Sequence, residues 1–195
     1  MSKKLKYSRR TKETSIELAL SVDGTGKYSI KTPLPFFNHM LEIFAKHGFF
    51  DLTLKAMGDV DVDDHHLVED VGLALGEAFL KQKETMKGVR RFGYSIVPLD
   101  EALVLASIDL SNRPYLNYGL SLRRARIKSF EVQLIEEFYR AFASALRCNV
   151  HVIQLAGKNT HHIVEASFKA FAKALDMATQ TDSRVKGVLS TKGTL

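Results

Sequence analysis

A five-residue sequence that begins with a histidine pair occurs twice in this chain. His65-His66-Leu67-Val68-Glu69 is matched by His161-His162-Ile163-Val164-Glu165, and each copy opens a run of apolar residues at helical spacing. These two HH-x-x-E sequences, here called the first and second box, lie about half the chain apart and indicate an internal duplication. A duplication constrains the fold strongly, because both halves must then adopt the same supersecondary structure.

The elements expected around the boxes follow one order in both halves. Alternating apolar residues predict strands, apolar residues three and four apart predict helices, and Asp64 and Thr160 are expected to cap the two box helices. In the first half these are strands 17–22, 27–31 and 51–56 and helices 37–46 and 65–80; in the second half they are strands 103–109, 115–120 and 150–155 and helices 131–146 and 161–175. Turn residues between the first two strands of each half predict that these strands pair as a hairpin.

The predicted unit is therefore β-β-α-β-α, and we expect it at about residues 13–87 and again at about residues 99–180. Each unit alone would expose one face of its sheet. The two should therefore pack as a single α+β domain over residues 1–195, with two sheets packed with helices. Residues 88–98 are expected to link the units, and residues 181–195 to form a polar C-terminal tail.

Composition removes several classes of protein. An apolar content of 45% can form a core, and no run of about 18 apolar residues could span a bilayer, so we expect a folded protein without a membrane partner. No signal-peptide core follows the basic N-terminus, and the single cysteine, Cys148, excludes a disulfide framework. We therefore expect a cytoplasmic protein.

Basic residues outnumber acidic ones, 28 to 22, and the net charge of +6 suits an anionic ligand without requiring nucleic acid. One basic cluster could contact nucleic-acid phosphates; it comprises Arg123, Arg124, Arg126 and Lys128. Because no aromatic residues interleave this cluster for base stacking, we interpret it as a solvated loop and expect no nucleic-acid partner.

The boxes have the composition of metal sites. On a helix, the first histidine and the glutamate are four apart and the second histidine and the glutamate three apart, so all three lie near one surface. Adjacent histidines point about 100° apart, so one doublet cannot easily bind a single ion with both rings. Each doublet therefore suggests two ions, and mixed His–carboxylate ligands suit Mn²⁺, with Fe, Ni or Zn as substitutes. A lone doublet is more often a polar helix start, but the repeated glutamate favours metal binding.

Four aspartates precede the first box: Asp59, Asp61, Asp63 and Asp64. They do not have the spacing of a calcium loop. We expect Asp59 and Asp61 to line the exposed side of a short strand. Asp63 or Asp64 should cap the helix or orient a histidine.

Further motifs run along nearly the whole chain. They are Thr11-Lys12-Glu13-Thr14, Pro35-Phe36-Phe37-Asn38-His39-Met40-Leu41, Asp63-Asp64 with the first box and Asp70, Arg91-Phe92-Gly93, Asp109-Leu110-Ser111-Asn112-Arg113-Pro114-Tyr115, Gly157-Lys158-Asn159-Thr160 with the second box, Phe168-Lys169-Ala170, and Ser190-Thr191-Lys192-Gly193. In this order they resemble the imidazoleglycerol-phosphate dehydratase family.

The resemblance implies a metal-dependent lyase of L-histidine biosynthesis. Such an enzyme, a hydro-lyase that cleaves a carbon–oxygen bond, dehydrates D-erythro-imidazoleglycerol phosphate to imidazole-acetol phosphate and water. The resemblance further implies two Mn²⁺ ions per subunit, or other divalent ions. It also implies a homo-oligomer of twenty-four subunits with active sites between subunits.

Residue roles also follow from the resemblance. The implied metal ligands are His39, His65, His66, Glu69, Glu137, His161, His162 and Glu165. At position 137 the family pattern usually has histidine, but a carboxylate can still bind a divalent ion. Asn38 stands where aspartate is usual and removes a charge beside His39. The implied phosphate-binding residues are Arg91, Arg113, Lys169, Ser190 and Lys192.

The resemblance assigns Glu13 to contact the substrate and act as the catalytic base. Elimination requires an electron sink when the carbon-bound proton leaves, and the imidazole ring of the substrate is the one available. Taken alone, Glu13 would read as a solvated N-terminal charge. The alternative class is a metal-binding shell without catalysis, in which removal of Glu13 would change neither metal content nor activity. An inactive paralogue of the enzyme is a further alternative.

Overall fold

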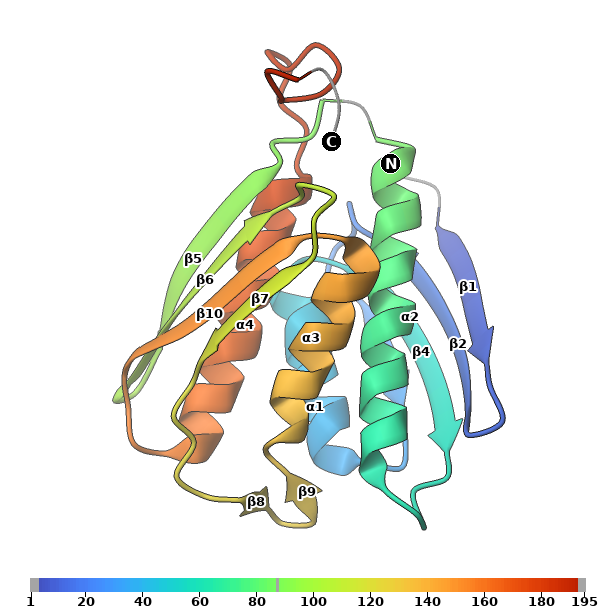
Figure 1. Cartoon of the computed structure of the whole chain (residues 1–195), viewed down its shortest axis with the longest axis vertical. Helices are drawn as coiled ribbons and strands as arrows, with labels where there is room; N and C mark the ends of the chain where they lie inside the picture. Colours follow the sequence, from blue (N-terminus) through green and yellow to red (C-terminus); the bar gives the residue numbers. More distant parts are fainter. Residues whose placement is uncertain (1–3, 87, 193–195) are drawn as a thin grey trace.

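Each half of the chain builds a four-stranded mixed sheet, and helices lie between the two sheets (Figure 1). The computed structural model describes residues 4–86 and 88–192. The first half contains β1 (Leu5–Arg10), β2 (Thr14–Ser21), β3 (Tyr28–Lys31), α1 (Pro35–His47), β4 (Asp51–Gly58) and α2 (Asp64–Glu84). The second half contains β5 (Phe92–Leu99), β6 (Ala102–Asp109), β7 (Tyr115–Gly119), the short β8 (Arg126–Ile127) and β9 (Phe130–Glu131), α3 (Leu134–Leu146), β10 (Asn149–Ala156) and α4 (Thr160–Thr179).

The two sheets have the same topology. Their strand orders are β1-β2-β4-β3 and β5-β6-β10-β7. In each sheet the strand that precedes the box helix lies in the interior, antiparallel to one neighbour and parallel to the other. The predicted α+β class and the duplication are therefore confirmed.

The predicted hairpins are wrong. β4 lies between β2 and β3, and β10 lies between β6 and β7, so the first two predicted strands of each half do not pair. The turn after β2 instead joins the start of β4, because the amides of Thr25 and Lys27 donate to the Asp51 carboxylate at 2.8 and 3.0 Å. Gly24 is required there, since a Cβ would lie 2.5 Å from the Asp51 nitrogen.

Two edge strands were missed by the sequence analysis. β1 lies within the basic N-terminal segment, and β5 lies within the segment interpreted as a linker. Inward-facing and outward-facing residues alternate in both strands, but neither strand shows the regular alternation of apolar and polar residues that predicts a strand. β1 has mainly charged side chains, and β5 exposes Phe92, Tyr94 and Ile96. Each half thus has an additional strand in front of the predicted β-β-α-β-α order.

The helices pair across the two halves. α2 covers the inner face of the first sheet and packs against α3, whereas α4 covers the second sheet and packs against α1. A Cβ at Gly72 would lie 2.8 Å from the Phe138 carbonyl oxygen, and one at Gly76 would lie 2.7 Å from that of Phe142. Both contact points advance by four residues, so α2 and α3 run in the same direction, and Leu134, the first residue of α3, lies at about the height of Val68, one turn into α2.

One phenylalanine from each helix meets at the centre of this layer. Phe44, Phe79, Phe142 and Phe171 are at most 1% exposed, and their ring centroids lie 5.1–6.2 Å apart in five pairs. The two halves therefore share one hydrophobic core. All four helices begin at the same end of the molecule, the lower end in Figure 1, and the C-terminal tail lies at the opposite end. Among the described residues, no helix is long and apolar enough to cross a membrane.

Candidate metal centre and active site

Both boxes occupy the first turn of a capped helix. Asp63 accepts a hydrogen bond from the amide of His65 at 2.9 Å, and Asn159 accepts the same bond from His161 at 2.9 Å. Asp63 and Asn159 have the extended backbone of N-cap residues. The predicted caps Asp64 and Thr160 are one residue too late, because both are already helical, whereas the alternative prediction of Asp63 as the first cap is confirmed.

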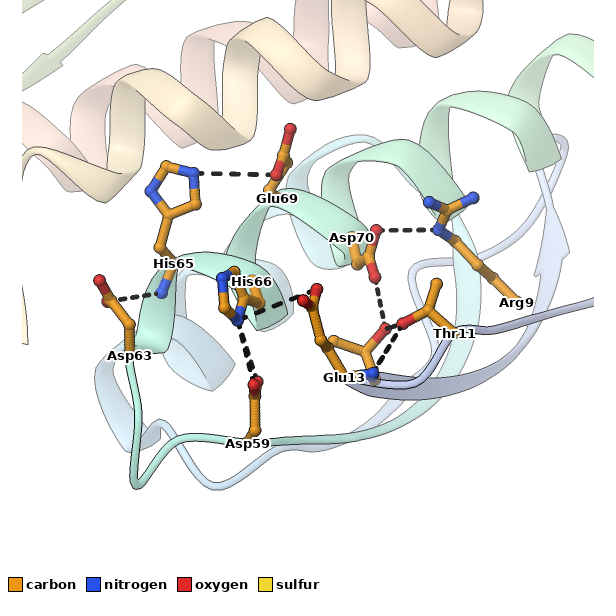
Figure 2. Close-up of polar contacts among 10 residues, drawn as sticks. Arg9, Thr11, Glu13, Asp59, Asp63, His65, His66, Glu69 and Asp70 are labelled. Atoms are coloured by element: carbon orange, nitrogen blue, oxygen red, sulfur yellow. Dashed lines mark hydrogen bonds and ion pairs between the residues drawn. The ribbon is translucent and has the colours of Figure 1, made fainter.

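The two rings of each doublet diverge. Their planes lie 84° apart in the first doublet and 87° apart in the second, with ring centroids separated by 6.3 and 6.2 Å. Figure 2 shows His65 directed toward Glu69 and His66 directed toward Asp59 and Glu13. This divergence fits the expectation that the two rings of a doublet serve different ions.

His39 of α1 joins the second box across the helix interface. Its Nε2 lies 3.8 Å from Oε2 of Glu165, and Nε2 of His161 lies 3.2 Å from the same oxygen. The ligand atoms of these three residues all lie within 4.8 Å of one another. Metal bonds of about 2.0–2.2 Å place neighbouring ligands about 3 Å apart and opposite ligands about 4 Å apart. The side chains therefore fit a divalent ion with nitrogen and oxygen ligands.

Asn38 does not contact His39 through its amide. Its Oδ1 accepts from the amide of Thr32 at 3.0 Å, and its Nδ2 donates to the Thr32 carbonyl at 3.0 Å. An ionised aspartate could only accept, so the amide suits this position. Asn38 fixes the segment leading into α1 and thereby the start of the helix that carries His39.

The pKa of Glu165 is lowered in this cluster. Burial raises the pKa of its carboxyl, but Lys169 and His161 more than offset burial, so the net pKa is lowered. Nζ of Lys169 lies 2.7 Å from Oε1 of Glu165, and both side chains are mostly buried. Lys169 is therefore held beside the second box.

The equivalent cluster of the first half is incomplete. Nε2 of His65 lies 3.7 Å from Oε2 of Glu69, but Glu137 is paired with Arg140, whose Nε lies 3.6 Å from its carboxylate. In the part of the chain that the structure describes, these residues do not form a three-ligand group as the His39 cluster does. The register of α2 against α3 nevertheless places Glu137 at about the height of Val71, two residues beyond Glu69.

The second histidine of each doublet is held by a carboxylate. Nδ1 of His66 lies 3.1 and 3.2 Å from the two oxygens of Asp59, and Nδ1 of His162 lies 2.8 Å from Oε2 of Glu101. These contacts raise the pKa of both histidines, and the His162 contact, with two backbone amides, lowers the pKa of Glu101 to about 2. Sequence reasoning missed both carboxylates: it gave Asp59 a place on a strand surface, and it did not single out Glu101.

Glu13 lies in the turn between β1 and β2. Thr11 Oγ1 accepts from the amides of Glu13 and Thr14 at 3.1 and 2.9 Å, which fixes the turn. The turn is tied to α2 because Thr14 hydrogen-bonds Asp70. The half-exposed Glu13 carboxylate lies 4.0 Å from Nδ1 of His66 (Figure 2). The structure thus brings Glu13 beside the first box.

Most of the predicted phosphate residues lie far from the boxes. Arg91 is bound to Asp109, with Nε 2.6 Å from Oδ1, and its Nη1 donates to the Leu189 carbonyl at 2.8 Å. It therefore anchors the tail that carries Ser190 and Lys192. The tail follows the last turn of α4, whereas the second box occupies the first turn of the same helix. A helix of 20 residues is about 30 Å long, so the tail and the box are separated by about that distance along the helix axis. Gly193 and the rest of 193–195 lie outside the described residues.

Arg113 is exposed in the segment before β7. Its Nη1 lies 3.4 Å from the Ser111 carbonyl oxygen, a long contact for a hydrogen bond. β7 begins at the same end of its sheet as β5, beside the start of β10. Within one chain, only Lys169 of the predicted phosphate residues therefore lies beside a box.

Comparison with known proteins identifies the family. The family model described as imidazoleglycerol-phosphate dehydratase matches residues 32–175, which include both boxes. The chain belongs to the imidazoleglycerol-phosphate dehydratase family. It is a hydro-lyase and catalyses the dehydration step of histidine biosynthesis that defines this family.

Several dehydratases of the family match the chain over its full length. The enzymes of Geobacter sulfurreducens and Acetivibrio thermocellus are 51% and 52% identical over 195 residues, which is 100% of this chain and of each relative. The dehydratase structure from Staphylococcus aureus has a TM-score of 0.83 at 35% identity and covers 91% of this chain and 100% of that one. The one from Pyrococcus furiosus has a TM-score of 0.83 at 42% identity, over 96% of this chain and 99% of that one.

Proposed function

We propose that this dehydratase acts at a centre built from both boxes, with Glu13 as base and with a phosphate clamp supplied by another subunit. The observation that carries the proposal is the cluster of His39, His161 and Glu165, whose ligand atoms lie within 4.8 Å of one another. Its geometry suits a divalent cation, and the same doublet recurs beside Glu13 in the other half.

Two divalent ions, Mn²⁺ by ligand chemistry, would use these side chains. His39, His161 and Glu165 would hold one, while His65, Glu69 and Glu137 would contribute to the other; His66 and His162 would complete the two ligand sets. When bound, such ions supply Lewis-acid polarisation of the substrate's ring nitrogens. Glu137 would need to turn from Arg140 to take part, which its partly exposed side chain can do.

Glu13 is positioned to move the carbon-bound proton. Its carboxylate lies 4.0 Å from His66, and its turn is fixed to α2 through Thr14 and Asp70. A base must be held in place beside the bound substrate while its carboxylate stays free to accept a proton. Glu13 meets both conditions, because its backbone is anchored and its side chain is half exposed.

The phosphate clamp would come from a neighbouring subunit. The boxes and the tail lie at opposite ends of α4, about 30 Å apart along the helix axis. Imidazoleglycerol phosphate joins its ring to its phosphate through a three-carbon chain, which is far shorter. If Arg113, Ser190 and Lys192 bind the phosphate, they must do so at the site of another copy of the chain. This favours a homo-oligomer with active sites between subunits, for which the family resemblance implies twenty-four.

The proposal is tested by removing the base without removing the ligands. The Glu13→Gln variant should retain the Mn²⁺ content of the unaltered protein and lose turnover by about 10²–10⁴-fold, the range for loss of a general base. Glu17→Gln, which removes the same charge on β2, is the matched control. Turnover in Glu13→Gln equal to that of an active unaltered protein would exclude Glu13 as the base. Absence of turnover in both proteins would favour the non-catalytic alternative.

A further inference from the structure

The duplication places a glutamate at the same position in both halves. Glu13 is the last residue before β2, and Glu101 is the last residue before β6. The pairing of the sheets supports this equivalence, because Leu20 lies opposite Leu52 in the first sheet and Ile108 lies opposite Val150 in the second. Counting back seven residues from Leu20 and from Ile108 reaches the two glutamates.

The two equivalent glutamates have different partners. Oε1 of Glu101 accepts from the amides of Lys158 and Asn159 at 3.2 and 2.7 Å, and Oε2 lies 2.8 Å from Nδ1 of His162. Both carboxylate oxygens of Glu101 are thus engaged. The Glu13 carboxylate approaches its histidine only to 4.0 Å.

Asp59 accounts for this difference. In the first half it takes the position on Nδ1 of His66 that Glu101 takes on His162. The backbone of Asp59 is itself fixed, since its amide donates to the Glu13 carbonyl at 3.2 Å and its carbonyl accepts from Val62 at 2.8 Å. The Asp59 carboxylate therefore approaches His66 from an ordered loop.

The second half has no room for a counterpart of Asp59. Four residues, 59–62, separate β4 from the cap of α2, but only 157 and 158 separate β10 from the cap of α4. Gly157 has a φ of +123°, and a Cβ there would lie 2.9 Å from Cα of Ala102. A side chain at Gly157 is excluded, and the shorter loop leaves the histidine to the glutamate of the strand turn.

We propose that Glu101 is a positioning residue that holds His162 through Nδ1 and leaves Nε2, whose one carboxylate neighbour among the described residues is the exposed Asp100 at 3.8 Å, as the metal-binding nitrogen. Asp59 does the same for His66, and because Asp59 takes this role, Glu13 is free to act on the substrate. The duplicated glutamates have therefore diverged, one toward chemistry and one toward orientation of a ligand. The inference rests on the proposed function in one respect, namely that His66 and His162 bind metal.

The test measures Mn²⁺ binding by the full-length protein, with the electron paramagnetic resonance signal of free Mn²⁺ as readout. Glu101→Ala and Asp59→Ala should each weaken binding at one class of site by about 10–100-fold, the range for loss of an orienting partner. Glu101→Gln keeps one acceptor oxygen and should weaken binding less. Asp61→Ala removes the same charge from an exposed position of the longer loop and should bind like the unaltered protein.

Turnover separates a positioning role from a catalytic one. At saturating Mn²⁺, Glu101→Ala should recover most of its activity, whereas Glu13→Gln should not. Unchanged Mn²⁺ affinity in Glu101→Ala would overturn the proposal, as would a loss of turnover that excess Mn²⁺ does not restore. If Glu101→Ala fails to fold, as judged by circular dichroism, Glu101→Gln and Asp59→Ala decide instead. An unaltered protein that binds Mn²⁺ without dehydrating the substrate would contradict the proposed function and leave the binding test intact.

Discussion

His39 and Glu165 lie 126 residues apart in the chain, yet Nε2 of the histidine is 3.8 Å from Oε2 of the glutamate. They belong to different halves of the duplication, because His39 is on α1 and Glu165 on α4. The repeated unit therefore does not contain a complete ligand cluster. The second box meets a histidine from the other half, and in our proposal the helix pairing that forms the core also forms the metal centre.

Replacing His39 tests this dependence across the halves. His39→Ala removes one of three ligand groups from the cluster and should lower the affinity of one class of Mn²⁺ site, with the second class unchanged. A chelator-competition titration measures both classes. His151→Ala, which removes a histidine whose ring nitrogen contacts Asn117, is the control. Equal Mn²⁺ affinity in the two variants would show that His39 is not a metal ligand.

Glu137 provides a test of the other cluster. Glu137→Gln should weaken the class of Mn²⁺ site that His39→Ala leaves intact, because an amide oxygen is a weaker ligand than a carboxylate. Glu136→Gln removes the same charge one residue earlier and also loses a contact with Arg140. It should bind Mn²⁺ normally. If both variants bind alike, the ion does not use Glu137.

The separation of boxes and tail predicts complementation between inactive chains. Glu13→Gln and Lys192→Ala should each be inactive or nearly so. When they are dissociated together and reassembled, some sites should combine an intact Glu13 from one chain with an intact Lys192 from another. Activity should then return, as measured by product formation. Reassembled mixtures no more active than either parent would mean that each chain builds its own site.

The central aromatic cluster should dominate stability. Phe142 is fully buried and contacts phenylalanines from the other three helices. Phe142→Ala should lower the free energy of unfolding by about 3–5 kcal/mol, the range for such truncations. Denaturant titration measures the loss. A loss below about 1 kcal/mol would show that the two halves do not depend on this contact.

The burial of Cys148 predicts that the protein loses stability as the pH becomes alkaline. Burial raises the pKa of its thiol from 9.0 to about 12. The native state therefore retains a proton that the unfolded state loses, so the stability contributed by this group is fully present below pH 9 and falls as the pH rises toward 12. The difference in stability between the protein and Cys148→Ala should shrink over this range. A difference independent of pH would contradict the burial of the thiol.

Much of the fold and the two boxes of the candidate site could be predicted from the repeat, whereas the roles of Glu13 and His39 followed only from the family resemblance. The box helices and the α+β class follow from apolar spacing, because a duplicated pattern is hard to misread. Strand pairing could not be predicted, since the Gly24 turn resembles a hairpin turn and its contact with Asp51 exists only once β4 has entered the sheet. Glu101 was equally hidden, because its equivalence to Glu13 depends on strand register.

Metal restoration tests the central claim most directly. The protein is stripped of metal, bound Mn²⁺ is counted per chain, and formation of imidazole-acetol phosphate from imidazoleglycerol phosphate is measured before and after Mn²⁺ is returned. We predict no turnover without metal and full turnover at two ions per chain. Turnover by the stripped protein, or saturation of activity with no bound Mn²⁺, would contradict the account.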